Sequence, residues 1–199
     1  QILRGRDTET GQFLPELRDA QFRRLKEAQP KVLDLNDWHA YLHALRSAGF
    51  IGPDTISSEN SVIYTYVLYL LGKHQCGVQE PHLSRLIRRW FVTVTLSARY
   101  SGSSESTMDG DLGDLKEATT PEAFAGSLER KIETTLTSDF WSISLPAALE
   151  TSAAVAPQLL AFRAAQVVLS APVLFSDKKV RDLLDPAMRP PTKSVEQHH

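Results

Sequence analysis

The stretch EPHLSRLIRRWFVTVTLSARY, residues 80–100, decides the fold, because its apolar side chains recur at the three- and four-residue spacing of one helical face. Glu80-Pro81 begins it, and proline is favoured in the first turn of a helix. The segment Val92-Thr93-Val94-Thr95 has the local preference of a β-strand, but a spacing kept over the whole stretch outweighs that preference. We therefore predict one long helix with a broad buried side that reaches about Tyr100. Its apolar positions are Leu83, Leu86, Ile87, Trp90, Phe91, Val94 and Leu96.

Apolar residues at helical spacing also predict helices on both sides of this stretch. The helix over about residues 60–73 is apolar on every side, so we expect it to take a central position with neighbours packed all round it. Thr119 or Thr120, followed by Pro121-Glu122, gives the clearest start of a helix. Ser103 or Ser104 is expected to cap the helix before it.

The remaining segments complete an all-α fold. Residues 14–29 predict a surface helix that ends before Pro30, and a second helix begins near Asn36 as its N-cap and is stopped by Gly49. Later helices are predicted over 103–115, 120–136, 158–171 and 176–184, with a short segment at Phe140-Trp141. Because no pair of strands is evident, the predicted fold class is all-α, an irregular bundle of about eight helices.

Composition restricts the classes of function. The chain has 199 residues, of which 42% are hydrophobic and 23% charged, which is ordinary for a globular protein with its own core. A single cysteine, Cys76, excludes an internal disulfide and a Cys-rich zinc site and fits a reducing cytoplasm. The net charge of −2 gives no overall basic field, so any contact with DNA would be local. No uninterrupted apolar run approaches the roughly twenty residues of a membrane helix, so no membrane partner is expected.

The order of segments suggests three parts. Residues 1–7 have neither an initiator methionine nor an apolar signal region, and we expect a cut through a longer chain there. We predict an N-terminal arm and first helix over 1–33 and a helical bundle over 34–185. Residues 186–199 are predicted to form a proline-rich linker that ends in Glu196-Gln197-His198-His199.

Two segments resemble a known family. RLIRRWF, residues 85–91, and LSARYSGSSES, residues 96–106, resemble the middle of the GmrSD-type family of modification-dependent restriction and anti-phage proteins. That family tends to carry a version of VLDLNDWH, residues 32–39, upstream, and of LFS, residues 174–176, downstream, followed by Glu196 and His198-His199. The resemblance covers nearly the whole chain, and the combination Arg99-Tyr100-Ser101-Gly102-Ser103 is its most specific part.

The resemblance implies a role as a helical connector within a larger parent protein. Family members have an N-terminal nucleotide-dependent module with an Asp-Gly-Gln-Gln-Arg motif, which this chain lacks, and a C-terminal HNH nuclease, of which it has at most the first two motif residues. The implied parent is a DNA endonuclease that uses a divalent metal and a nucleoside triphosphate, and its partners are the flanking domains and DNA. The fragment itself is expected to have neither a cofactor nor an activity.

The same resemblance assigns roles to the last two residues. His199 maps to the catalytic base that deprotonates the attacking water, and His198 maps to the residue on the metal side. Two adjacent histidines at a C-terminus are also typical of a purification-tag remnant, and that alternative stays open.

Basic side chains near the long helix are candidates for phosphate contact. Arg88 and Arg89, with Arg85 beside them, can match phosphate oxygens, although arginines on a polar helix face are more often solvated or paired with acids. The turn that begins at Arg99 places backbone N–H groups at a helix start, where anions can bind. In the alternative that we favour, Arg99 pairs locally and joins Tyr100 in holding two helices together.

Two further groups are weaker candidates for metal sites. His39 and His43 have the spacing of a two-histidine site, but two partly exposed helix histidines are the simpler interpretation. The acidic set does not have the spacing of a calcium loop and predicts a solvated helix face. It comprises Glu105, Asp109, Asp111, Asp114 and Glu117. The rival functions are therefore a self-contained helical protein-interaction domain and a small hydrolase built on the two histidines.

Overall fold

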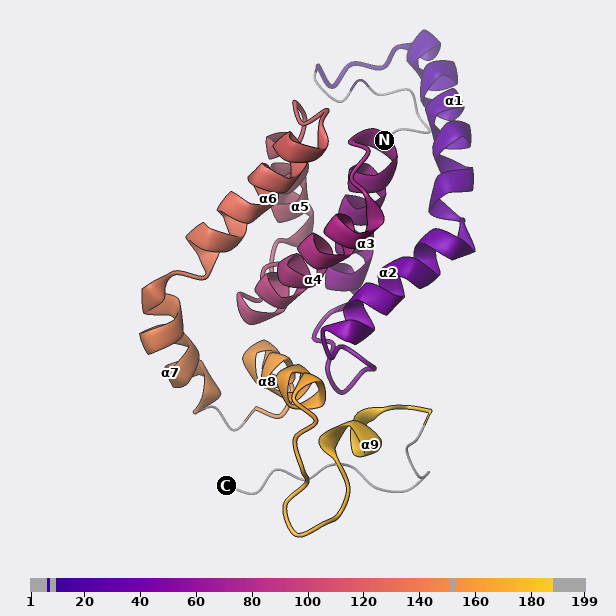
Figure 1. Ribbon diagram of the computed structural model, residues 1–199. Helices are drawn as coiled ribbons and strands as arrows, with labels where there is room; N and C mark the ends of the chain where they lie inside the picture. The colour runs from indigo at the N-terminus through magenta and orange to yellow at the C-terminus, as the bar shows by residue number, and fades with distance from the viewer. Residues whose placement is uncertain (1–6, 8–9, 151–152, 188–199) are drawn as a thin grey trace. The chain divides into compact units, whose positions relative to one another are not determined.

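The structure is a computed structural model that describes residues 7, 10–150 and 153–187 (Figure 1). Over these residues it is all-α, as predicted, with nine α-helices and no strand. None of the described helices is both long and apolar enough to cross a membrane. The helices are α1 (Pro15–Val32), α2 (Leu35–Ser47), α3 (Glu59–Leu70), α4 (Glu80–Leu96), α5 (Ser104–Asp114), α6 (Pro121–Thr135), α7 (Leu145–Leu149), α8 (Pro157–Val168) and α9 (Val180–Leu184), with π-helical segments η2 (Leu71–Gln75) and η3 (Phe140–Ser144).

The chain divides into two compact units, and the boundary between them falls within α2, between His39 and Ala40. In the first unit α1 continues through Pro30 to Val32, so the predicted end before this proline is wrong. The N-cap of α2 is Asp34, two residues before the predicted Asn36, because the Asp34 carboxylate accepts a hydrogen bond of 2.8 Å from the backbone N–H of Asn36.

Helix α4 is the central element of the second unit, where it packs against α3, α6 and α8 (Figure 1). The long helix predicted over this stretch is confirmed, but it ends at Leu96 rather than near Tyr100. Its buried threonines satisfy their own hydroxyls, since Thr93 donates to the Arg89 carbonyl and Thr95 to the Phe91 carbonyl, both at 2.9 Å. This local bonding lets β-branched polar residues lie on the buried side of a helix.

Helix α3 does not take the central position predicted for it. Ile63 is 53% exposed, so one side of this apolar helix faces solvent. The buried side carries Tyr66 and Tyr69, whose rings lie 5.1 and 5.8 Å from that of Tyr41. The helix continues into η2, where Gly72 is buried.

Three helices end in the same left-handed turn. Gly49 after α2, Ala98 after α4 and Ser170 after α8 have φ of 90°, 51° and 52°. In each case the next N–H bonds the carbonyl five residues back, as in a Schellman motif. A Cβ atom at residue 49 would lie 2.0 Å from the carbonyl oxygen of Ala164, so this turn needs glycine for space as well as for conformation.

Helices α5 and α6 begin where the sequence predicts, but only α6 is capped as predicted. Thr120 accepts a hydrogen bond of 3.2 Å from the N–H of Ala123 and caps α6. Ser103 occupies the N-cap position of α5 without a side-chain cap bond, and the Ser104 hydroxyl accepts from the Asn60 amide instead, at 3.2 Å.

A narrow turn joins α8 to α9. The backbone N–H of Val173 bonds the carbonyl of Lys178 at 2.8 Å, and Phe175 at the tip is 99% exposed with φ of 58°. Helix α9 therefore begins at Val180, four residues later than predicted. Its Leu184 packs with Ile51, Val167 and Val180 in a small apolar cluster.

Candidate functional site

A buried carboxylate joins the turn after α4 to α5 and α6. Asp111 Oδ2 accepts hydrogen bonds from Arg99 Nε at 2.9 Å and from Tyr100 Oη at 2.7 Å. Its Oδ1 accepts from Arg99 Nη2 and, at 2.6 Å, from Lys131 Nζ. Lys131 also reaches Asp114, with 2.6 Å between Nζ and Oδ2. We call Arg99, Tyr100, Asp111 and Lys131 the Asp111 cluster.

The charges of the Asp111 cluster stabilise one another. Burial of Asp111 raises the pKa of its carboxyl, but hydrogen bonds from Arg99, Lys131 and Tyr100 more than compensate, so that the pKa lies below its usual value. Burial and the bond to Asp111 raise the pKa of the Tyr100 phenol. The carboxylate is therefore ionised and the phenol protonated near neutral pH.

Aromatic rings surround the cluster on the α3 and α4 sides. The Arg99 guanidinium carbon lies 5.6 Å from the ring centroid of Trp90, within the range of a cation–π contact. The ring of Tyr100 meets that of Tyr64 edge to face, with 5.2 Å between centroids. Trp90 is buried, and its Nε1 has no hydrogen-bond partner among the described residues.

The cluster corrects one prediction about the acidic residues and bears on another about Arg99. Asp111 has a fully buried side chain, so the solvated face predicted for the acidic set is wrong at this position, although Asp114 is 61% exposed. The guanidinium of Arg99 binds this carboxylate, which favours local pairing over phosphate contact. Arg99 and Tyr100 hold helices together, as that alternative expected.

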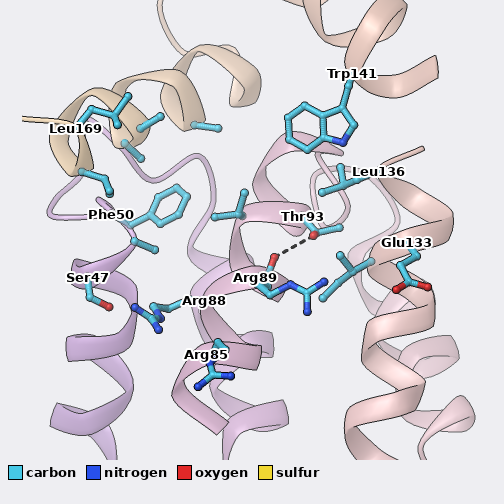
Figure 2. Close-up of a pocket in the computed structure, with 17 residues that line it drawn as sticks. Ser47, Phe50, Arg85, Arg88, Arg89, Thr93, Glu133, Leu136, Trp141 and Leu169 are labelled. Atoms are coloured by element: carbon cyan, nitrogen blue, oxygen red, sulfur yellow. Dashed lines mark hydrogen bonds between the residues drawn. The ribbon is translucent and has the colours of Figure 1, made fainter. Parts of the chain in front are cut away.

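The other arginines lie along an apolar groove between α4, α6 and α8, with a volume of about 730 Å³. Figure 2 shows Arg85, Arg88 and Arg89 toward one end of this groove and Trp141 at the other. Arg89 pairs with Glu129 at 3.3 Å, whereas Arg85 and Arg88 make no ion pair with any described residue. The walls are formed by Phe50, Val92, Ile132, Leu136, Trp141, Ala161, Ala164, Ala165, Val168 and Leu169.

A smaller cavity of about 330 Å³ adjoins the groove and shares Ser47 and Val168 with it. It is lined mainly by polar and basic side chains, His43, Arg46 and Arg181 among them. Arg46 is already engaged, because its Nη2 pairs with Asp185 Oδ2 at 3.0 Å.

Of the four candidate metal and catalytic histidines, the structure describes His39 and His43. Among the residues that the structure describes, no three His, Cys, Asp or Glu side chains form a group that could hold a metal ion. His39 and His43 lie on α2, and His198 and His199 lie outside the described residues. Cys76 is buried and has no disulfide, and its Sγ lies 3.1 Å from the carbonyl oxygen of Ala118.

Sequence reasoning identified the arginines of the groove but not the groove itself. The available signals were the small residues Ala161, Ala164 and Ala165 on α8 and Phe50 directly after a helix-ending glycine.

Comparison with known proteins adds no assignment: no family model, no curated protein and no solved structure matches this chain.

Proposed function

We propose that the helical unit is the connector of a GmrSD-like defence endonuclease, between a nucleotide-dependent module and an HNH nuclease. One observation carries the proposal. Arg99 and Tyr100, from the most specific part of the resemblance, both bind the buried carboxylate of Asp111. The segment that carries the resemblance therefore fixes α4, α5 and α6 relative to one another. A connector needs such a network, because coupling between domains is carried by packed side chains and by networks of hydrogen bonds and ion pairs.

In this proposal the chemistry belongs to the cytoplasmic parent protein. His199 would act as the base for the water that attacks phosphorus, and His198 would lie on the side of the divalent metal ion. DNA and the flanking domains would be the partners, and a nucleoside triphosphate would act on the N-terminal module.

The test is DNA cleavage by the full-length parent protein. We expect His199→Ala to abolish cleavage, since loss of a general base costs at least about a hundredfold in rate. His82→Ala is the matched control, because His82 is an exposed histidine on α4 outside the groove, and its removal should leave cleavage unchanged. Wild-type cleavage by the His199→Ala protein would remove the proposed base.

The alternative is a self-contained helical protein-interaction domain, and the open groove favours it, because Trp141 on its wall is 49% exposed. The parent reading frame separates the two. Phe-Pro and a second HNH histidine after His199 support the nuclease, and a stop codon supports the interaction domain. A third hypothesis, a hydrolase built on His39 and His43, requires metal in the purified protein, and elemental analysis that finds none eliminates it.

A further inference from the structure

We propose that the groove between α4, α6 and α8 binds a single-chain amphiphilic anion, a molecule with one apolar chain and one phosphate or carboxylate head. The proposal concerns the groove itself and does not depend on the connector function.

The size and walls of the groove suit an apolar chain. Its volume of about 730 Å³ falls within the range of roughly 300–1,000 Å³ that is typical of small-molecule sites. Phe50, Leu136 and Trp141 lie around it in Figure 2. Trp141 remains 49% exposed and Val168 54% exposed, so an alkyl chain laid between them would remove apolar surface from water.

The opposite end of the groove suits an anionic head. Arg85 and Arg88 are three residues apart on α4, so they lie on the same side of the helix, and neither pairs with a described carboxylate. Two guanidinium groups can together bind the oxygens of one phosphate or carboxylate. Glu133 lies on the α6 side of the groove and Arg89 pairs with Glu129, so the head belongs beside Arg85 and Arg88.

The adjoining cavity reinforces this choice of charge. It meets the groove at Ser47, near Arg88 in Figure 2, and brings His43, Arg46 and Arg181 to the same part of the surface. Arg46 pairs with Asp185, but Arg181 makes no ion pair with a described residue, so its charge attracts an anionic head and repels a cationic one.

The apolar part of the groove decides between this ligand and nucleic acid. A DNA backbone could contact the arginines but would leave the exposed apolar side chains Trp141, Val168 and Leu169 uncovered, because phosphate contacts use only the charged end. An amphiphile with one anionic head uses both ends of the groove at once.

The experiment is isothermal titration calorimetry of the 199-residue chain with dodecyl phosphate below its micelle-forming concentration. Dodecyltrimethylammonium carries the same chain with the opposite charge, and inorganic phosphate carries the head alone. We expect dodecyl phosphate to bind at least about tenfold more tightly than either, because only this compound combines the apolar chain with a head that accepts hydrogen bonds from the arginines. Equal affinity for the two dodecyl compounds would overturn the proposal.

Two variants locate the site. Arg85→Gln/Arg88→Gln should weaken dodecyl phosphate about tenfold or more. Ala165→Trp, on an exposed position of the groove wall, should block the chain. Arg130→Gln is the control, because Arg130 lies on α6 outside the groove and bonds the Gly126 carbonyl.

Circular dichroism and thermal melting check that each variant is folded. If the double variant does not fold, the single variant Arg85→Gln replaces it, because the Arg85 side chain is exposed. Wild-type affinity in both groove variants contradicts the proposal. Binding of an acidic amphipathic peptide without binding of dodecyl phosphate also overturns it and assigns the groove to a protein partner.

Discussion

The carboxylate of Asp111 accepts hydrogen bonds from both Nε and Nη2 of Arg99, across the turn that joins α4 to α5. Arg99 is 24% exposed and Asp111 is fully buried, so the pair lies at the edge of the core rather than on the open surface. Removing one member leaves the other charged group buried without compensation, which costs more than the intact pair contributes.

Asp111→Asn should therefore reduce the free energy of unfolding by about 3 kcal/mol, at the low end for a broken buried pair because Arg99 retains some contact with water. Urea unfolding followed by circular dichroism at pH 7 measures it. Asp114→Asn is the matched control, since its side chain is 61% exposed and its pair with Lys131 should contribute at most about 1 kcal/mol. Equal losses in the two variants would show that Asp111 has no special role.

The contribution of Asp111 to the free energy of unfolding should depend on pH. Burial raises the pKa of this carboxyl, but the bonds from Arg99, Lys131 and Tyr100 bring it below its usual value, so the folded protein binds this proton less readily than the unfolded chain. The stabilisation is complete above the unfolded pKa of about 3.9 and is lost as pH falls through the folded pKa. The difference in unfolding free energy between wild type and Asp111→Asn should narrow as pH drops below about 4. A difference that stays constant from pH 7 to pH 2 would contradict this linkage.

The left-handed turns after α2 and α4 should respond in opposite ways to exchange of glycine and alanine. Gly49→Ala should destabilise by about 3 kcal/mol or more, because the new Cβ would lie 2.0 Å from the Ala164 carbonyl oxygen. Ala98→Gly should stabilise by about 0.5 kcal/mol, since relief of the left-handed conformation slightly exceeds the entropy cost of glycine. Thermal melting of both variants tests the pair, and destabilisation by Ala98→Gly would show that other contacts fix this turn.

The helix starts offer a second matched pair. Thr120→Ala should cost about 1 kcal/mol, because it removes the bond from the Ala123 N–H at the start of α6. Ser103→Ala at the same position of α5 should cost less than about 0.5 kcal/mol, since that side chain makes no cap bond. Urea midpoints compare the two, and an equal cost would mean that the observed cap bond contributes nothing.

The helices could be predicted from sequence because helical spacing is a local property. The apolar positions of α4, from Leu83 to Leu96, define its buried side without reference to any neighbour. Its end was misplaced because Ala98 takes a conformation that usually needs glycine. The sequence also could not show that α4, and not the apolar helix α3, is central. An apolar residue such as Ile63 on α3 looks the same in the sequence whether its side chain is exposed or buried.

The candidate sites could be predicted only in part because they depend on distant contacts. Asp111 looks solvated in its own helical pattern, and its partners come from the turn after α4 and from Lys131 on α6. The groove has no local pattern at all, because its walls come from α4, α6 and α8 and from the residues around Phe50 and Trp141. Only the arginines of α4 stood out beforehand, and Arg88 and Arg89 remain predicted phosphate contacts.

The turn between α8 and α9 has a consequence for handling the protein. Phe175 at its tip is 99% exposed, against 60% for Phe13 and 49% for Trp141, so we expect a protease that cleaves after aromatic residues to cut there first. The piece released by that cut would still be held noncovalently, because Leu184 packs with Ile51 and Val167 and Asp185 pairs with Arg46. A nicked preparation would therefore elute as one species under native conditions and separate into two polypeptides only in denaturant.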